Sequence, residues 1–223
     1  MTLTIRRLVP ALPPWLSRLM ELRIDVSHDP KRFDEEIASI YDRIRKPGHS
    51  LHGIPEIPTD DPDLVFRYRE ADGEFYVYVE DIRREQLVGY TVFNRLIEVS
   101  KRADRFVRAP HSKYDPQYQR RGLATAIYRW GLDAGLCLMT GARQSTGAHA
   151  LWHALARRYE LGYVDLRSKT LTYLGREVSP QVLDDLHTRM ILLGDGWTVD
   201  RFAKATGMNL PPACAWASRP LTA

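Results

Sequence analysis

The sequence predicts a mixed α/β (α+β) fold, in which helices flank a central, mostly antiparallel mixed sheet, with helical N-terminal and C-terminal elaborations. Two observations predict it. Residues 63–114 hold consecutive runs rich in Val, Tyr and Phe, separated by short turns, as in strand hairpins. Residues 115–175 then alternate between helical and strand-like patterns. Hairpins followed by alternating elements are typical of a mixed sheet covered by helices.

The composition agrees with a soluble globular protein. The chain has 223 residues, of which 44% are hydrophobic and 27% charged, and this excludes a disordered chain. The formal net charge of +4 is compatible with an anionic ligand or nucleic acid but demands neither. Cys137 and Cys214 have no disulfide or metal-type spacing. The N-terminus has no signal-peptide pattern and no apolar stretch approaches a membrane span, so we expect a cytoplasmic protein.

The first 63 residues read as a helical part that ends in a long loop. Residues 3–8 suit a short strand, and a first helix fits Leu16 to Ile24. A second helix fits 29–46, where apolar residues recur at helical spacing. Residues 47–63 are rich in proline and form a long loop, which suggests a functional role.

The central elements follow in order. Strands are expected at 64–70, 74–80 and 86–96, with "ADG" and "DIRRE" turns between them. A weaker strand at 105–114 contains Pro110, which predicts an edge or a bulge. A helix should start directly after Gly122, and a short strand should cover 136–140.

The last part is expected to end in helices. The pattern at 145–163 predicts a helix capped by Ser145 or Thr146, and 163–167 with 170–175 predict a strand pair. A strong helix is expected over 179–193 and one more over 198–207, ending at Gly207. We therefore expect a single domain at 1–178, with a helical N-terminal part at 1–62 and a core at 63–178, and a C-terminal helical extension at 179–223.

The stretch "YDPQYQRRGLATAIYRW", residues 114–130, is the first candidate site. A helix N-terminus exposes unpaired N–H groups and positive dipole charge, and Gly122 lets a ligand approach the backbone. Arg120 and Arg121 could add charge-assisted hydrogen bonds. These features predict a diphosphate-binding loop. The alternative is a solvated basic turn that caps a helix, and neither a P-loop nor a dinucleotide GxGxxG motif is present.

The same residues carry a family resemblance. The segment from Gln119 to Ala124 matches the [QR]-x-x-G-x-[GA] coenzyme A signature of the GNAT superfamily of N-acyltransferases. The resemblance covers about residues 63–175 and implies a GNAT-like sheet and acetyl-CoA as cosubstrate, with no metal. It implies that coenzyme A contacts the following residues: Gln119, Arg120, Arg121, Gly122, Leu123, Ala124 and Thr125.

The end of the next helix, "RRYELGY", resembles the family's frequent helix ending, with Tyr159 four residues before Tyr163. The resemblance implies that Tyr159 is the general acid that protonates the leaving thiolate; the alternative is a packed tyrosine. The family often has an asparagine seven residues before this tyrosine, where this chain has Trp152. Ser145 could replace it as a polar contact.

The resemblance also implies a mechanism. The pantetheine arm would lie between strands at about 105–114 and 136–141, where a backbone N–H meets the thioester carbonyl. An amine would attack directly, so Cys137 is expected to be a core residue. Candidates for the general base are Glu80, Asp81, Glu98 and His111, of which His111 and Glu80 rank first.

The sequence leaves the acceptor open among small amines, protein lysines or N-termini, and nucleic-acid bases. The alternative function is a non-catalytic nucleic-acid- or partner-binding module that uses the basic segment 101–121. The helical extensions are candidates for a homodimer contact. His149 and His153 stand i,i+4 but lack a third ligand, so no metal site and no membrane association are expected.

Overall fold

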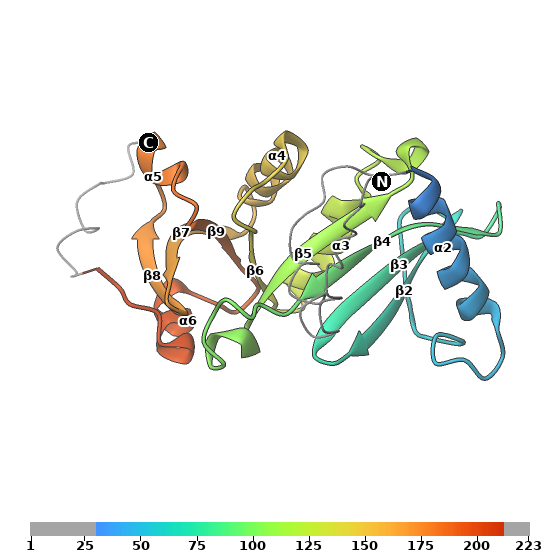
Figure 1. Cartoon of the computed structure of the whole chain (residues 1–223), viewed down its shortest axis with the longest axis horizontal. Coiled ribbons are helices and arrows are strands. Elements are labelled where there is room, and N and C mark those ends of the chain that lie inside the picture. The colour runs from blue at the N-terminus through green and yellow to red at the C-terminus, as the bar shows by residue number, and fades with distance from the viewer. Residues whose placement is uncertain (1–29, 212–223) are drawn as a thin grey trace, which may run out of the picture.

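The protein is described by a computed structural model that covers residues 30–211. The strand expected at 3–8, the helix at 16–24 and Cys214 lie outside these residues. The mixed α/β fold is confirmed within them, because nine strands form one sheet in the order β1-β2-β3-β4-β5-β6-β9-β7-β8 (Figure 1). All neighbouring strands are antiparallel except β5 and β6. None of the helices in 30–211 is long and apolar enough to cross a membrane.

The strands have the following bounds: β1 Glu56–Ile57, β2 Leu64–Ala71, β3 Glu74–Asp81, β4 Gln86–Asn94, β5 Val107–Tyr114, β6 Cys137–Met139, β7 Glu160–Arg167, β8 Thr170–Gly175 and β9 Thr188–Leu193. The helices are α2 Pro30–Arg45, α3 Leu123–Asp133, α4 Thr146–Leu155, α5 Pro180–Leu183 and α6 Val199–Thr206.

The predicted hairpins of the first half are confirmed. Strands β2 and β3 pair from Ala71–Glu74 onward, so only Asp72 and Gly73 form the turn. Both have positive φ, 55° and 77°, as a two-residue turn that follows the sheet twist requires. Strand β4 pairs with β3 from Gln86 to Phe93 and with β5 from Gly89 to Asn94, and β5 is the middle strand of the nine.

Side-chain alternation along β3 and β4 divides the core between two faces of the sheet. Val77, Val79 and Phe93 pack with α3 and α4, while Tyr78 and Tyr90 pack under α2. The second half has its own cluster on the α2 side, where Phe202 of α6 is fully buried against β6, β7 and β9. Helices α3 and α4 thus cover one face, and α2 and α6 cover the other.

The helix expected over 179–193 is wrong. Only α5 is helical, and Thr188–Leu193 form β9, which lies between β6 and β7. Leu183 and Leu186, which the apolar face of such a helix would bury, are 44% and 53% exposed. The apolar residues fit a helical period, but the continuous run "MILL" is also typical of a strand buried on both faces, and tertiary pairing decides for the strand. Part of the expected helical extension is therefore a strand of the sheet.

Two other helix predictions can be compared with the structure. The helix expected at 145–163 is shorter, since α4 ends at Leu155 and the remainder forms a turn and the start of β7. The helix at 198–207 is confirmed as α6, with Gly207 at its C-cap and a φ of 78°. The shorter α4 moves Tyr159 from a helix into the turn before β7.

Candidate functional site

The loop before α3 is fastened to the sheet by Tyr118. Its ring is 2% exposed, and its hydroxyl donates a 2.5 Å hydrogen bond to Oδ2 of Asp81 at the end of β3. Burial raises the pKa of Asp81, but the hydrogen bonds from Tyr118 and the Arg84 N–H, with the charge of Arg84, outweigh burial and lower it overall. Asp81 therefore holds the loop as a carboxylate, and one of its oxygens is already bonded to Tyr118.

The backbone of this loop turns sharply twice. Arg120 has a φ of 59° and Gly122, the N-cap of α3, has a φ of 83°. The left-handed conformation costs a non-glycine residue about 1–2 kcal/mol, so Arg120 stores strain at this point. No acceptor within 30–211 binds the N–H groups of residues 120–125, and the first helical bond runs from Ala126 N to Gly122 O at 2.9 Å.

Three arginines surround this helix N-terminus. The guanidinium of Arg121 lies over the Tyr118 ring at 5.0 Å and forms a 3.0 Å ion pair with Asp61. The guanidinium of Arg84 lies on the same ring at 5.8 Å, and Arg120 is exposed. A Cβ at Gly122 would meet nothing within 4 Å, so the space in front of the helix is open. Open N–H groups, a helix dipole and arginines are the features that favour anion binding at a helix N-terminus.

Below this loop, β5 and β6 separate. The two strands pair only at Val107–Cys137 and Arg108–Leu138, whereas β5 continues to Tyr114. Pro110 follows two residues after the last pair and has no N–H to donate. Strands at about 105–114 and 136–141 were expected to splay apart, and β5 does leave β6 within that range. Cys137 is fully buried, as expected, and burial raises its pKa to about 12.

Tyr159 lies at the opposite end of α3. Its hydroxyl donates a 2.6 Å hydrogen bond to Oδ1 of Asp133, the last residue of that helix. Burial, followed by this bond and the charge of Asp133, raises the pKa of Tyr159. Both residues border a cleft of about 520 Å³ that Arg158, Glu160 and the loop 193–197 also line. Eleven residues of α3 separate the cleft from Gly122, a length of about 16 Å.

The remaining predicted base candidates lie apart from one another. Glu80 is 3% exposed and accepts hydrogen bonds from Nε of Arg67 and, at 3.3 Å, from the Tyr41 hydroxyl. Glu98 forms a 3.4 Å ion pair with Arg189. His111 is half-buried on β5, opposite Val92 of β4, on the face that α2 covers. Of these, only His111 lies on the strand that separates from β6.

The polar residues of α4 have local roles. Oγ of Ser145 accepts a 3.2 Å hydrogen bond from Ala148 N and caps the helix, as one of the two expected caps. His149 and His153 face each other with 3.1 Å between their Nε2 atoms. No group of three or more metal-ligating side chains exists within the described residues.

Two groups of polar side chains were missed by sequence reasoning. On the α2 face, Glu36 accepts a 2.6 Å hydrogen bond from the Tyr90 hydroxyl and a 3.4 Å contact from Lys113 of β5. On the α3 face, Thr91, Ser112, Tyr114 and Tyr128 bring four hydroxyls together. In the sequence these groups appear only as polar residues on the inward face of a strand or helix. That pattern does not show which residues they contact.

Several cations of the basic segment 101–121 are engaged within the fold, while Lys101, Arg105 and Arg120 are exposed. Arg102 donates to the Ala205 carbonyl at 2.7 Å, and Arg108 is 8% exposed and donates to the Asp104 carbonyl at 2.5 Å. Lys113 and Arg121 are paired with carboxylates. Most of these cations therefore hold the fold together.

No protein-family model and no curated protein matches the sequence. Solved structures with distant similarity include a GNAT superfamily phosphinothricin acetyltransferase from Sinorhizobium meliloti in complex with AcCoA, at 22% identity and TM-score 0.36, covering 56% of this chain and 63% of that one. A spermidine N-acetyltransferase SpeG chimera from Vibrio cholerae and hSSAT has 15% identity and TM-score 0.34, covering 80% and 87%.

A third, a cAMP-binding acyltransferase from Mycobacterium smegmatis, has 11% identity and TM-score 0.39, covering 80% and 59%. The chain thus spans less than two thirds of the length of the first and the third of these proteins. Identity and TM-score are low in all three, and what this chain does has to be inferred from its own residues.

Proposed function

We propose that the chain is an acyl-CoA-dependent N-acyltransferase of the GNAT type, which transfers an acetyl group from acetyl-CoA to a primary amine by direct attack. The observation that carries the proposal is the loop before α3. Its N–H groups from 120 to 125 have no acceptor in 30–211, and Arg120 and Arg121 flank them. A diphosphate would satisfy these donors and neutralise the positive end of the helix.

The separation of β5 from β6 supports the same proposal. An extended arm that enters from the phosphate site can follow β5 between Pro110 and Tyr114, where β6 no longer pairs with it. Backbone N–H groups on such an edge are preorganised donors for the oxyanion that forms when an amine attacks a thioester. Holding both substrates in line contributes much of the rate, and no nucleophilic cysteine is needed.

We propose one acid and one base for the proton transfers, where the sequence left several candidates. Tyr159 stays our proposed acid, and it would protonate the thiolate only after its hydroxyl leaves Asp133. His111 is the proposed base, because it lies on β5, the strand that separates from β6, and histidine is the side-chain type best suited to accept a proton near neutral pH. Glu80 is bonded to Arg67 and Tyr41, and Ser145 caps α4, so we assign both a structural role.

Acetyl-CoA binding tests the proposal without knowledge of the acceptor. Acetyl-CoA at about a hundred times its dissociation constant should stabilise the protein by about 2.7 kcal/mol, a rise of a few degrees in Tm. Gly122→Glu should abolish the shift, because a carboxylate would occupy the phosphate site.

Gly48→Glu is the matched control. Gly48 has a φ of 81° and, like Gly122, nothing within 4 Å of its Cβ position, so both variants carry similar backbone strain and the same added charge. A shift retained in Gly48→Glu and lost in Gly122→Glu supports the proposal. No shift in the folded wild type, with acetyl-CoA or longer acyl-CoA species, would refute it. If acetyl-CoA binds, a panel of small amines, followed by DNA, would identify the acceptor.

A further inference from the structure

Four hydroxyl groups meet beneath α3; we call them the hydroxyl cluster (Thr91, Ser112, Tyr114 and Tyr128). Three of them are tightly bonded: Thr91 Oγ1 lies 2.7 Å from Ser112 Oγ and 2.6 Å from the Tyr114 hydroxyl. These distances are those of good hydroxyl–hydroxyl hydrogen bonds. The three residues lie on adjacent strands, since Thr91 pairs with Ser112 across β4 and β5.

Tyr128 is the exception in this cluster. Its ring is 5% exposed and packs against Phe93 at 5.9 Å, yet within residues 30–211 its hydroxyl has one partner, Ser112 Oγ at 3.5 Å. That distance lies beyond the normal range for a hydroxyl hydrogen bond. A buried hydroxyl without a good partner lowers stability, and a group of this kind in a folded protein calls for an explanation.

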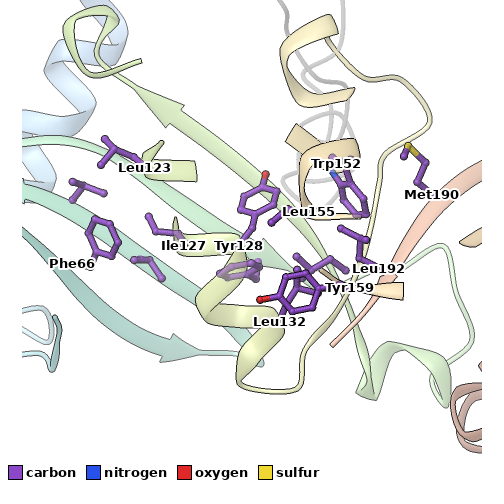
Figure 2. Close-up of a cluster of buried hydrophobic side chains, with 14 of the residues drawn as sticks. Phe66, Leu123, Ile127, Tyr128, Leu132, Trp152, Leu155, Tyr159, Met190 and Leu192 are labelled. Carbon is purple, nitrogen blue, oxygen red and sulfur yellow. The ribbon is translucent and has the colours of Figure 1, made fainter. Parts of the chain in front are cut away.

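The position of the Tyr128 hydroxyl suggests which group completes its hydrogen bonding. Figure 2 shows the Tyr128 ring standing on α3 with its oxygen directed away from the helix, toward the side where β5 and α4 face each other. Ser112 lies on β5 four residues after Arg108, the last residue of β5 that pairs with β6. Tyr128 follows Gly122 by six residues, so its backbone lies about 9 Å along α3 from the phosphate site.

The hydroxyl groups of Tyr159 and Tyr128 point in different directions, although both side chains belong to the same core cluster. The Tyr159 hydroxyl is bound to Asp133 at the C-terminal end of α3, and Figure 2 shows it pointing to another side of that helix than Tyr128. Of the two phenols, Tyr128 is the one that lies beside the separating strand.

We propose that the Tyr128 hydroxyl donates a hydrogen bond to the carbonyl oxygen of the acyl thioester when acyl-CoA is bound, and so stabilises the oxyanion of the acyl transfer. This inference rests on the proposed function. As the amine nitrogen attacks the carbonyl carbon, the C–N bond forms and charge builds on that oxygen, which a fixed donor stabilises. The C–S bond then breaks, His111 takes the proton that the amine loses and Tyr159 gives one to the thiolate, so that overall one proton passes from the amine to the sulfur. Tyr128 keeps its own proton throughout.

The environment of Tyr128 suits a donor rather than an acid. Burial raises the pKa of Tyr128 to about 12, with the Ser112 hydrogen bond as a smaller opposing effect. The phenol therefore stays protonated over the whole range in which an amine acceptor works. The ring is buried and packs against Phe93, and this fixes the position of its hydroxyl oxygen.

The direct test is the infrared carbonyl stretch of acetyl-CoA labelled with ¹³C at the carbonyl, bound to the wild type, Tyr128→Phe and Tyr159→Phe. In the wild type the band should move to lower wavenumber than in water-free solvent, as a hydrogen-bonded carbonyl does. Tyr128→Phe should lose the part of this shift that the hydroxyl causes, while Tyr159→Phe keeps it. Affinity for acetyl-CoA should fall by about three- to tenfold in Tyr128→Phe, the value of one hydrogen bond.

Three outcomes separate the proposals. An unchanged band in Tyr128→Phe overturns the assignment of Tyr128. Weaker binding with an unchanged band also overturns it, because the hydroxyl would then contact another part of the arm. If the wild type does not bind acetyl-CoA, the proposed function itself fails. The unfolding temperature of Tyr128→Phe should be no lower than that of the wild type, since only a 3.5 Å contact is lost and a buried hydroxyl without a good partner is removed.

Discussion

The hydroxyl of Tyr159 and the carboxylate of Asp133 are joined by a 2.6 Å hydrogen bond that ties the turn after α4 to the C-terminal end of α3. The bond connects two segments that are 26 residues apart in the chain. It also fixes the edge of the 520 Å³ cleft that both residues line.

Tyr159→Phe should therefore lower the free energy of unfolding by about 1–2 kcal/mol, because the bond joins a neutral donor to a charged acceptor. Urea unfolding measures this. Asp133→Asn keeps an acceptor and should cost less. If Tyr159 also protonates the thiolate, the turnover of Tyr159→Phe with an identified amine falls while its affinity for acetyl-CoA is kept; unchanged turnover would remove it as the acid.

Asp61→Asn should tighten binding of acetyl-CoA. Asp61 holds Arg121 in a 3.0 Å ion pair at an accessible site, and a phosphate has to compete with it. Exposed pairs of this kind are worth about 0.2–1 kcal/mol, which corresponds to as much as about a fivefold gain in affinity at low salt. Titration calorimetry at low and high salt measures the gain, which should shrink as salt screens the charges. Weaker binding by Asp61→Asn would mean that Arg121 does not contact the ligand.

The lowered pKa of Asp81 predicts how the free energy of unfolding depends on pH. Because its pKa in the folded protein is lowered, the carboxylate stabilises the fold fully above the ordinary aspartate value of 3.8, and this contribution is lost as pH falls through the lower folded value. At neutral pH, Asp81→Asn should reduce the free energy of unfolding by about 2 kcal/mol. The difference from the wild type should shrink toward about pH 3 in urea unfolding.

Asp63→Asn is the control for this series. Asp63 is 53% exposed and lies 3.9 Å from Arg83, so its removal should change stability by no more than about 0.5 kcal/mol at any pH. A gap between Asp81→Asn and the wild type that stays constant down to low pH would contradict the assignment of the charge to Asp81.

Glu80→Gln should act on stability more than on catalysis. Glu80 is 3% exposed and bonded to Arg67, so the amide would remove the buried one of the two carboxylates that pair with this guanidinium, Glu56 being the other. We expect a loss of about 2 kcal/mol in urea unfolding. Once an amine is identified, the pH profile of kcat/KM for Glu80→Gln should match the wild type, whereas His111→Gln should remove the acidic limb. A lost limb in Glu80→Gln would restore Glu80 as the base.

The sequence predicted well the elements whose signal is local. Helical spacing from Phe33 to Ile44 predicted α2, and the Val, Tyr and Phe runs around Asp72–Gly73 predicted the β2–β3 hairpin. Gly122 marked the start of α3, and its positive φ agrees with the reason a glycine is needed there. Each of these depends on backbone preferences and periodicity within a few residues.

Only the tertiary structure decided the elements whose partners are distant in the chain. Residues 179–193 carry apolar spacing that fits a helix, yet Thr188–Leu193 become β9 because the open edges of β6 and β7 bind them on both sides. The direction of a hydroxyl is decided in the same way: Tyr159 binds Asp133, and Tyr128 lies beside Ser112. A sequence determines which side chains are polar and inward, but long-range packing determines which atoms they meet, because those partners come together only when the sheet closes.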